Sequence, residues 1–181
     1  AGFYNDVFVL DQNACSSPHL VLWRGEEAEV DKAMLRFWGA VEHVLLSKPL
    51  FPVMQGLDKY AQLCRVSILL DSCVSVTRHR NLICRVRLKE LSSGIEHHKG
   101  QYGFFFEAVI KSVESLKTIV GERYQTVTCF GVDPEEIISL VVDTGWTGID
   151  RVVPVGKALD IGVVWDGYNL IESLSRIVAD C

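Results

Sequence analysis

Hydrophobic and polar positions along this chain follow two periods, and the helical period is clearest over residues 26–47. Apolar side chains recur there every three or four positions, which lays one stripe along a helix, at Val30, Met34, Phe37, Trp38, Val41, Val44 and Leu45. A second helix is expected over residues 57–70. Its predicted inner face consists of Leu57, Tyr60, Ala61, Cys64 and Ile68.

Shorter apolar runs predict strands in the first two thirds of the chain. Residues 7–10 and 20–22 flank a polar turn, and both runs are short enough for buried strands. Residues 82–88 alternate with period two, so a half-exposed strand is expected there. Residues 104–106 predict a short buried strand, followed by a helix over residues 107–120 in which Glu107 is a helix-start carboxylate.

The last third alternates strand and helix. Strands are expected over residues 124–130, 151–155 and 161–165, and a final helix over residues 169–178. Between the first two strands, Asp133 and Pro134 open a helix that ends by Gly145. This order predicts an α/β fold, with a mostly parallel sheet flanked by helices, in a single domain over residues 1–181.

Composition narrows the class of protein. The 181 residues are 49% hydrophobic and 23% charged, with a net charge of −5, which argues against general nucleic-acid binding. No apolar run reaches the roughly 18 residues of a membrane span, and no signal peptide is recognisable at the start. The six cysteines are scattered without C-x-x-C spacing, so we expect reduced thiols in a cytoplasmic protein and no metal site.

The polar turn between residues 10 and 20 carries the main chemical candidate, Cys15. Its neighbours Ala14, Ser16 and Ser17 are small, so a substrate carbonyl can approach the sulfur, and free backbone N–H groups in the turn can receive an oxyanion. The local residues alone leave a second interpretation open. Free cysteine is among the most buried residue types, and a structural thiol fits the same pattern.

Other candidate sites are weaker. The pair His97 and His98 suggests a metal ligand, but no third ligand is clustered with it. A Cys-His hydrolase is disfavoured because His19 lies only four residues from Cys15. The chain also lacks the P-loop and G-x-G-x-x-G patterns of nucleotide-binding proteins and the G-x-S-x-G pattern of serine hydrolases. One basic patch is interpreted either as a solvated face or as a seat for nucleotide phosphates, at Arg78, Arg80, Arg85, Arg87 and Lys89.

Several ordered motifs resemble the long-chain acyl-CoA reductases of bacterial bioluminescence, the LuxC family. The first motif contains Cys15 and leads into an apolar strand that ends at Trp23. The motifs span nearly the whole chain, at residues 11–18 (DQNACSSP), 100–107 (GQYGFFFE), 122–126 (ERYQT), 148–162 (GIDRVVPVGKALDIG) and 164–168 (VWDGY).

The resemblance implies an aldehyde dehydrogenase-like catalytic domain and thioester reduction. Cys15 is then the nucleophile that takes up a fatty acyl group, and hydride from NADPH releases a long-chain aldehyde. Asn13 is a candidate for stabilising the oxyanion with its side-chain amide. Glu122 is the nearest positional analogue of the glutamate that holds the nicotinamide ribose in the related dehydrogenases.

The resemblance also implies partners and a missing region. The expected substrate is a fatty acyl-CoA or acyl-protein, and the expected partners are the acyl-protein synthetase and acyl transferase subunits of a fatty acid reductase complex, in an oligomer. The NADPH-binding domain and the general base are expected upstream of this chain, so the chain alone is expected not to reduce an acyl group. The alternative is an acyl-accepting or interaction module without redox chemistry.

Overall fold

A four-stranded sheet in the order β1-β4-β3-β2 forms the centre of the molecule. The computed structural model describes residues 1–48 and 52–178, so Cys181 lies outside the described residues. β4 pairs in parallel with β1 and with β3, whereas β2 is an antiparallel edge strand. The strands are β1 (Leu20–Arg24), β2 (Cys73–His79), β3 (Ile83–Leu88) and β4 (Phe104–Ile110). The predicted α/β fold with a mostly parallel sheet is confirmed.

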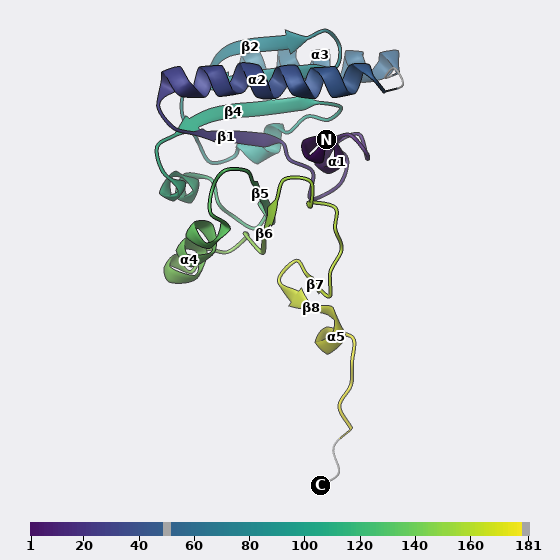
Figure 1. Cartoon of the computed structure of the whole chain (residues 1–181), viewed down its shortest axis with the longest axis vertical. Helices are drawn as coiled ribbons and strands as arrows, with labels where there is room; N and C mark the ends of the chain where they lie inside the picture. The colour runs from purple at the N-terminus through teal and green to yellow at the C-terminus, as the bar shows by residue number, and fades with distance from the viewer. Residues whose placement is uncertain (49–51, 179–181) are drawn as a thin grey trace.

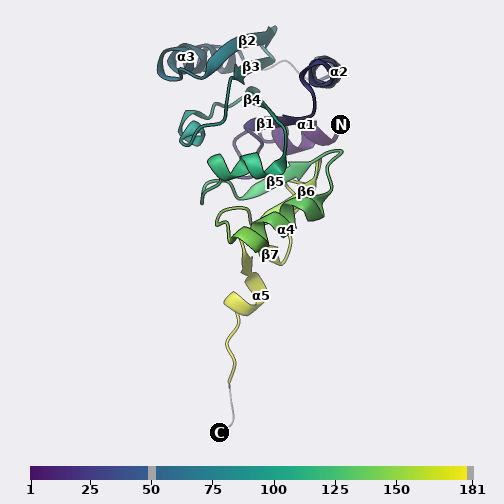
Figure 2. The same cartoon turned by 90° about the vertical axis from the view of Figure 1, so that its left-hand side faces the viewer.

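Helices cover both faces of this sheet (Figure 2). One face packs against α1 (Gly2–Val7) and α2 (Glu27–Leu46), with Trp38 and Phe105 at the centre of the contact. The other face packs against α3 (Val53–Leu69) through Val66. The predicted helix over residues 26–47 is confirmed, and Glu27 and Glu29 in its first turn suit the positive end of its dipole. No helix within the described ranges is long and apolar enough to cross a membrane.

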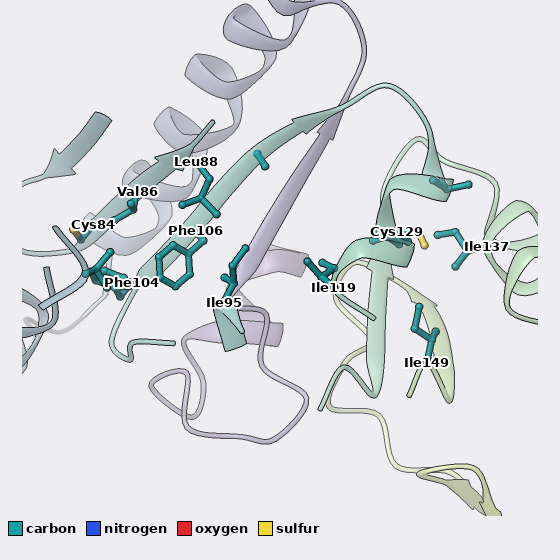
Figure 3. Close-up of a cluster of buried hydrophobic side chains, with 14 residues drawn as sticks. Cys84, Val86, Leu88, Ile95, Phe104, Phe106, Ile119, Cys129, Ile137 and Ile149 are labelled. Atoms are coloured by element: carbon teal, nitrogen blue, oxygen red, sulfur yellow. The ribbon is translucent and has the colours of Figure 1, made fainter. Parts of the chain in front are cut away.

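A smaller parallel sheet follows the central one (Figure 1). It pairs β5 (Thr126–Cys129) with β6 (Arg151–Pro154), and α4 (Pro134–Thr144) connects them. The Asp133 side chain accepts a hydrogen bond from the backbone N–H of Glu135 and so caps α4 as predicted. One buried cluster joins this unit to the central sheet, because Phe106 and Ile95 share it with Ile137 and Ile149 (Figure 3).

The C-terminal part projects away from the two sheets (Figures 1 and 2). It contains β7 (Val164–Trp165), β8 (Tyr168–Asn169) and α5 (Leu170–Ser173). The strand predicted over residues 161–165 is therefore reduced to two residues, and the helix predicted over residues 169–178 ends at Ser173. Most of the apolar side chains in this segment are exposed, including Leu174 and Ile177, so their burial does not stabilise a longer helix.

Two predictions near the ends of strands are wrong. Residues 7–10 form no strand, because Phe3 and Val7 lie one helical turn apart and bury the same face of α1, while Val9 and Leu10 are exposed. The helix predicted over residues 107–120 is replaced by the rest of β4 and by a 3-10 helix, η2 (Val113–Thr118). A continuous apolar run does not distinguish a buried strand from a buried helix.

Two further differences concern α3 and the edge strand. The residues predicted as the inner face of the second helix (Leu57, Tyr60, Ala61, Cys64 and Ile68) are all exposed, and Lys59 and Val66 are buried instead. The edge strand β2 was not expected, since the predicted patterns covered residues 57–70 and 82–88 only. A short 3-10 helix, η1 (Ile95–His98), lies between Gly94 and Gly100 and contains both His97 and His98.

Glu107 is a buried carboxylate in the middle of β4 and not a helix-start residue. Its Oε1 accepts hydrogen bonds from the indole N–H groups of Trp23 and Trp38, and its Oε2 pairs with the Arg85 guanidinium at 2.9 Å. Both charged side chains are almost fully buried, at 3% and 8% exposure. The carboxylate therefore joins β1, α2 and β3 through β4.

We predict that Glu107→Gln lowers the free energy of unfolding by about 3–5 kcal/mol, because it leaves the Arg85 charge unpaired in the core. Denaturant unfolding measures this change. Glu136→Gln is the matched control, since Glu136 pairs with Arg24 at the surface, where an ion pair contributes little. Equal effects of the two substitutions would contradict the role given to Glu107.

Candidate functional site

Cys15 lies in the loop that connects α1 to β1, and its side chain is exposed. The loop is closed by its own backbone: the N–H of Gln12 donates to the carbonyl of Val7, the N–H of Asn13 donates to that of Leu10, and the N–H of Ser17 donates to that of Ala14. The thiol is thus accessible on an ordered turn. The loop follows a helix and not the strand that the sequence predicted.

The side-chain amide of Gln12 fixes this loop from inside. Its Nε2 donates to the carbonyl of Pro18 at 2.8 Å and to that of Phe104 at 3.0 Å. Its Oε1 accepts from the backbone N–H groups of Gly103 at 2.9 Å and Phe104 at 3.1 Å. Gln12 is 1% exposed, and its amide uses all four of its hydrogen-bonding positions.

The loop backbone is held in an uncommon conformation. Asp11 and Gln12 have positive φ values of 51° and 62°, in the left-handed region that residues with a side chain seldom adopt. The Asp11 carbonyl accepts from the N–H of Tyr102, and its carboxylate accepts from Gln55 of α3. Strained backbone of this kind persists where surrounding contacts over-determine it. The contacts of Asp11 and Gln12 do so here.

The backbone just before β4, which binds the Gln12 side chain of the Cys15 loop, needs a glycine at position 103. Its φ is 89°, and a Cβ atom there would lie 2.4 Å from the carbonyl oxygen of Leu82. Only glycine fits this position without moving the backbone. Gly103 thereby brings its own N–H to the Gln12 side chain at the start of β4.

Asn13, the residue expected to stabilise an oxyanion, is exposed, and its amide is already in use. Its Nδ2 donates to the carbonyls of Leu10 and Asp11, and its Oδ1 accepts from Gln101. Both N–H groups of the amide therefore hold the loop in this conformation. An oxyanion reaches them only if these hydrogen bonds are replaced, so the oxyanion role of Asn13 stays a prediction.

His19 ends the loop and is partly buried at the start of the central sheet. Its pKa is lowered from 6.5 to about 4, mainly by burial and in addition by the nearby Lys99 charge, while a hydrogen bond with the Gly100 backbone acts in the opposite direction. The imidazole is thus neutral at neutral pH and supplies no positive charge for a Cys15 thiolate. His19 Nδ1 and Ser17 Oγ are buried without a hydrogen-bond partner among residues 1–48 and 52–178.

Glu122, the candidate cofactor-binding residue, is exposed before β5. It lines a shallow depression together with Glu96, Ile119, Gly121, Arg123 and Tyr124. The Tyr124 hydroxyl donates to Glu96 at 3.5 Å, and burial raises the pKa of this tyrosine. No hydrogen bond or ion pair within the described ranges joins Cys15 to Glu122.

Three of the five basic side chains in the patch have acidic partners, whereas Arg78 and Lys89 are exposed and form no ion pair within the described residues. The strand over residues 82–88 is buried and not half-exposed. Arg85 is buried against Glu107, and Arg87 pairs with Glu27 and Asp31 of α2. Arg80 lies 3.8 Å from Glu42. Arginines paired in this way are not free to bind phosphates, which argues against a phosphate seat at Arg80, Arg85 and Arg87.

The described cysteines are all free thiols in different environments. Cys15 and Cys64 are exposed, whereas Cys84 and Cys129 are buried. Burial raises the pKa of Cys84 to about 11 and also raises the pKa of Cys129. Thiolate chemistry therefore falls to an exposed cysteine. Among the residues that the structure describes, no three His, Cys, Asp or Glu side chains are grouped to hold a metal ion.

The chain has no significant match among protein-family models or curated proteins. Its relation to the acyl-CoA reductases therefore rests on the sequence motifs and stays a prediction. Gln12 is the residue of this site that sequence reasoning missed. Nothing in its immediate sequence marks it as buried, although it lies within the motif that contains Cys15.

We predict that Gln12→Met lowers the free energy of unfolding by at least about 2 kcal/mol, since backbone groups of Gly103, Phe104 and Pro18 lose their buried partner. Gln101→Ala is the control, because Gln101 is exposed and its amide reaches only Asn13. Denaturant unfolding compares the two variants. A loss as small in Gln12→Met as in Gln101→Ala would contradict the buried network.

A second prediction concerns pH. His19 has a pKa of about 4 in the folded protein, below its ordinary 6.5, so between these values the unfolded chain binds a proton that the folded chain does not. Stability is thus expected to fall as pH is lowered through this window, and less steeply in His19→Gln. Unfolding free energies measured across the window test this. His43→Gln, at an exposed site of α2, is the control, and an unchanged slope in His19→Gln would contradict the assignment.

Proposed function

We propose that this chain is the thiol-bearing catalytic domain of an NADPH-dependent fatty acyl thioester reductase with an aldehyde dehydrogenase-like fold. The observation that carries the proposal is the exposed Cys15 on a loop fixed by the buried Gln12 amide. The resemblance to the bioluminescence reductases supports it, because the motif around Cys15 contains both residues. A long-chain aldehyde for a luminescence reaction is the product that this resemblance implies.

In the proposed acylation step, the Cys15 thiolate attacks the carbonyl carbon of a fatty acyl thioester. A new sulfur–carbon bond forms, the bond to the donor thiol breaks, and the donor leaves as a thiolate that takes up a proton. The product is a thioester on Cys15. The fixed loop favours this step because the sulfur is held in one place while the substrate approaches from solvent.

NADPH, when bound, supplies the hydride that converts the Cys15 thioester to an aldehyde. One residue of this chain suits that cofactor: the exposed Glu122 carboxylate can accept hydrogen bonds from ribose hydroxyls. Cys15 then leaves as the thiolate and is ready for a second acyl group.

We predict that incubation with a long-chain acyl-CoA adds one acyl group to the chain, which hydroxylamine removes, as measured by intact-protein mass. Cys15→Ser is expected to abolish the addition. Cys64→Ser is the matched control because Cys64 is also exposed, and it should acylate as the wild type does. No addition to the wild type, or addition that persists in Cys15→Ser, would show that Cys15 is not the nucleophile.

The redox step separates a reductase from an acyl acceptor without redox chemistry. It is tested on the chain joined to the nucleotide-binding domain that the resemblance implies. A reductase oxidises NADPH and releases aldehyde from the acylated protein, and Glu122→Gln is expected to raise the KM for NADPH. Acylation without NADPH oxidation would favour the acyl acceptor.

A further inference from the structure

The outer side of α3 carries an apolar stripe whose side chains are exposed, although the Arg78 guanidinium lies 5.9 Å from the centre of the Tyr60 ring. The side chains on this side, named here the outer stripe, are Val53, Leu57, Tyr60, Ala61, Cys64 and Ile68. Leu57 is 57% exposed and Ile68 is 79% exposed. The helical period had predicted this stripe as a buried face, and an apolar surface of this kind marks a contact site.

The inner side of α3 is fixed, so the helix cannot turn the outer stripe toward the sheet. Lys59 is 5% exposed, and its ammonium group donates to the backbone carbonyls of Asn81, Leu82 and Tyr102. Val66 is fully buried in the cluster against β3 and β4. Figure 2 shows α3 as the outermost layer on the side of the sheet opposite α2. The outer stripe therefore faces away from the rest of the chain.

Two opposite charges beside the outer stripe, Asp58 and Arg65, could each pair with the other residue of a second copy of the chain. Asp58 and Arg65 lie along the same flank of α3, seven residues and about 10 Å apart along the helix axis. Both are exposed, and neither takes part in an ion pair within residues 1–48 and 52–178. They are too far apart to pair within one helix, since pairs in a helix form three or four positions apart.

We propose that the chain forms a twofold-symmetric dimer in which α3 packs antiparallel against α3 of a second copy. A twofold axis at the middle of α3 brings Asp58 beside Arg65 of the partner subunit, and Arg65 beside the partner's Asp58. The same axis passes next to Ala61, the smallest side chain of the outer stripe, so the two helices can approach closely. A self-complementary patch of this kind is what a twofold interface requires.

The apolar and charged features share one centre, which favours a second copy over an unrelated partner. Asp58 and Arg65 are centred between residues 61 and 62, and α3 runs from Val53 to Leu69, with its middle at Ala61. An unrelated protein that covers the stripe would not require this coincidence. The proposal is independent of the acyl chemistry, because α3 contributes none of the reacting groups.

Sedimentation equilibrium of the 181-residue chain tests the proposal. The wild type is expected to form a dimer with a dissociation constant below roughly 100 µM. Asp58→Arg and Arg65→Asp are each expected to weaken the dimer by at least about tenfold, because like charges then meet across the axis, and the double variant is expected to restore it. A monomeric wild type would overturn the proposal, and so would single variants that dimerise normally or a double variant that stays weak.

Crosslinking checks the position of the axis. In a Cys64→Ser background, Ala61→Cys is expected to form a disulfide dimer on mild oxidation. Ser67→Cys in the same background is the control, since Ser67 is exposed on the other flank and lies far from the axis. Circular dichroism confirms that all variants fold. Equal crosslinking at both positions, or none at Ala61→Cys, would overturn the antiparallel arrangement.

Discussion

The buried amide of Gln12 connects two segments that lie 92 residues apart in the sequence, the Cys15 loop and the start of β4. Its four hydrogen bonds all reach backbone groups, so they fix the path of the chain and not only a side-chain contact. Because a buried amide without partners is costly, the two segments must be ordered together. The position of Cys15 in the loop before β1 depends on this interaction.

A second buried polar group, the Glu107 carboxylate, lies in the middle of the same strand. Glu107 binds Trp23 of β1, Trp38 of α2 and Arg85 of β3, so the central strand β4 is tied to both neighbouring strands and to the covering helix. β4 thus carries one polar anchor at its beginning and one in its middle. The two anchors fix β4, and β4 in turn holds the loop before β1. A reactive group on that loop is therefore held in place while it is exposed to solvent.

Local patterns predicted the elements that have one apolar face and clear ends. The helix α2 and the capped helix α4 belong to this class. The same patterns were wrong where burial depends on distant contacts. Lys59 is buried because three backbone carbonyls surround its ammonium group, and this contact turns the apolar stripe of α3 outward. Cys15 was predicted from its motif, whereas Gln12 was missed because its partners come from residues 103 and 104.

The central claim is that Gln12 holds the Cys15 loop in the geometry that acyl transfer needs. The most direct test compares two reactions of Cys15 in folded wild type and folded Gln12→Met: acyl transfer from a long-chain acyl-CoA, and alkylation by iodoacetamide. Attack on a carbonyl depends on the positioned loop, whereas alkylation needs only an accessible thiolate. The acyl-transfer rate is expected to fall much more than the alkylation rate. Equal changes in both rates would contradict the claim.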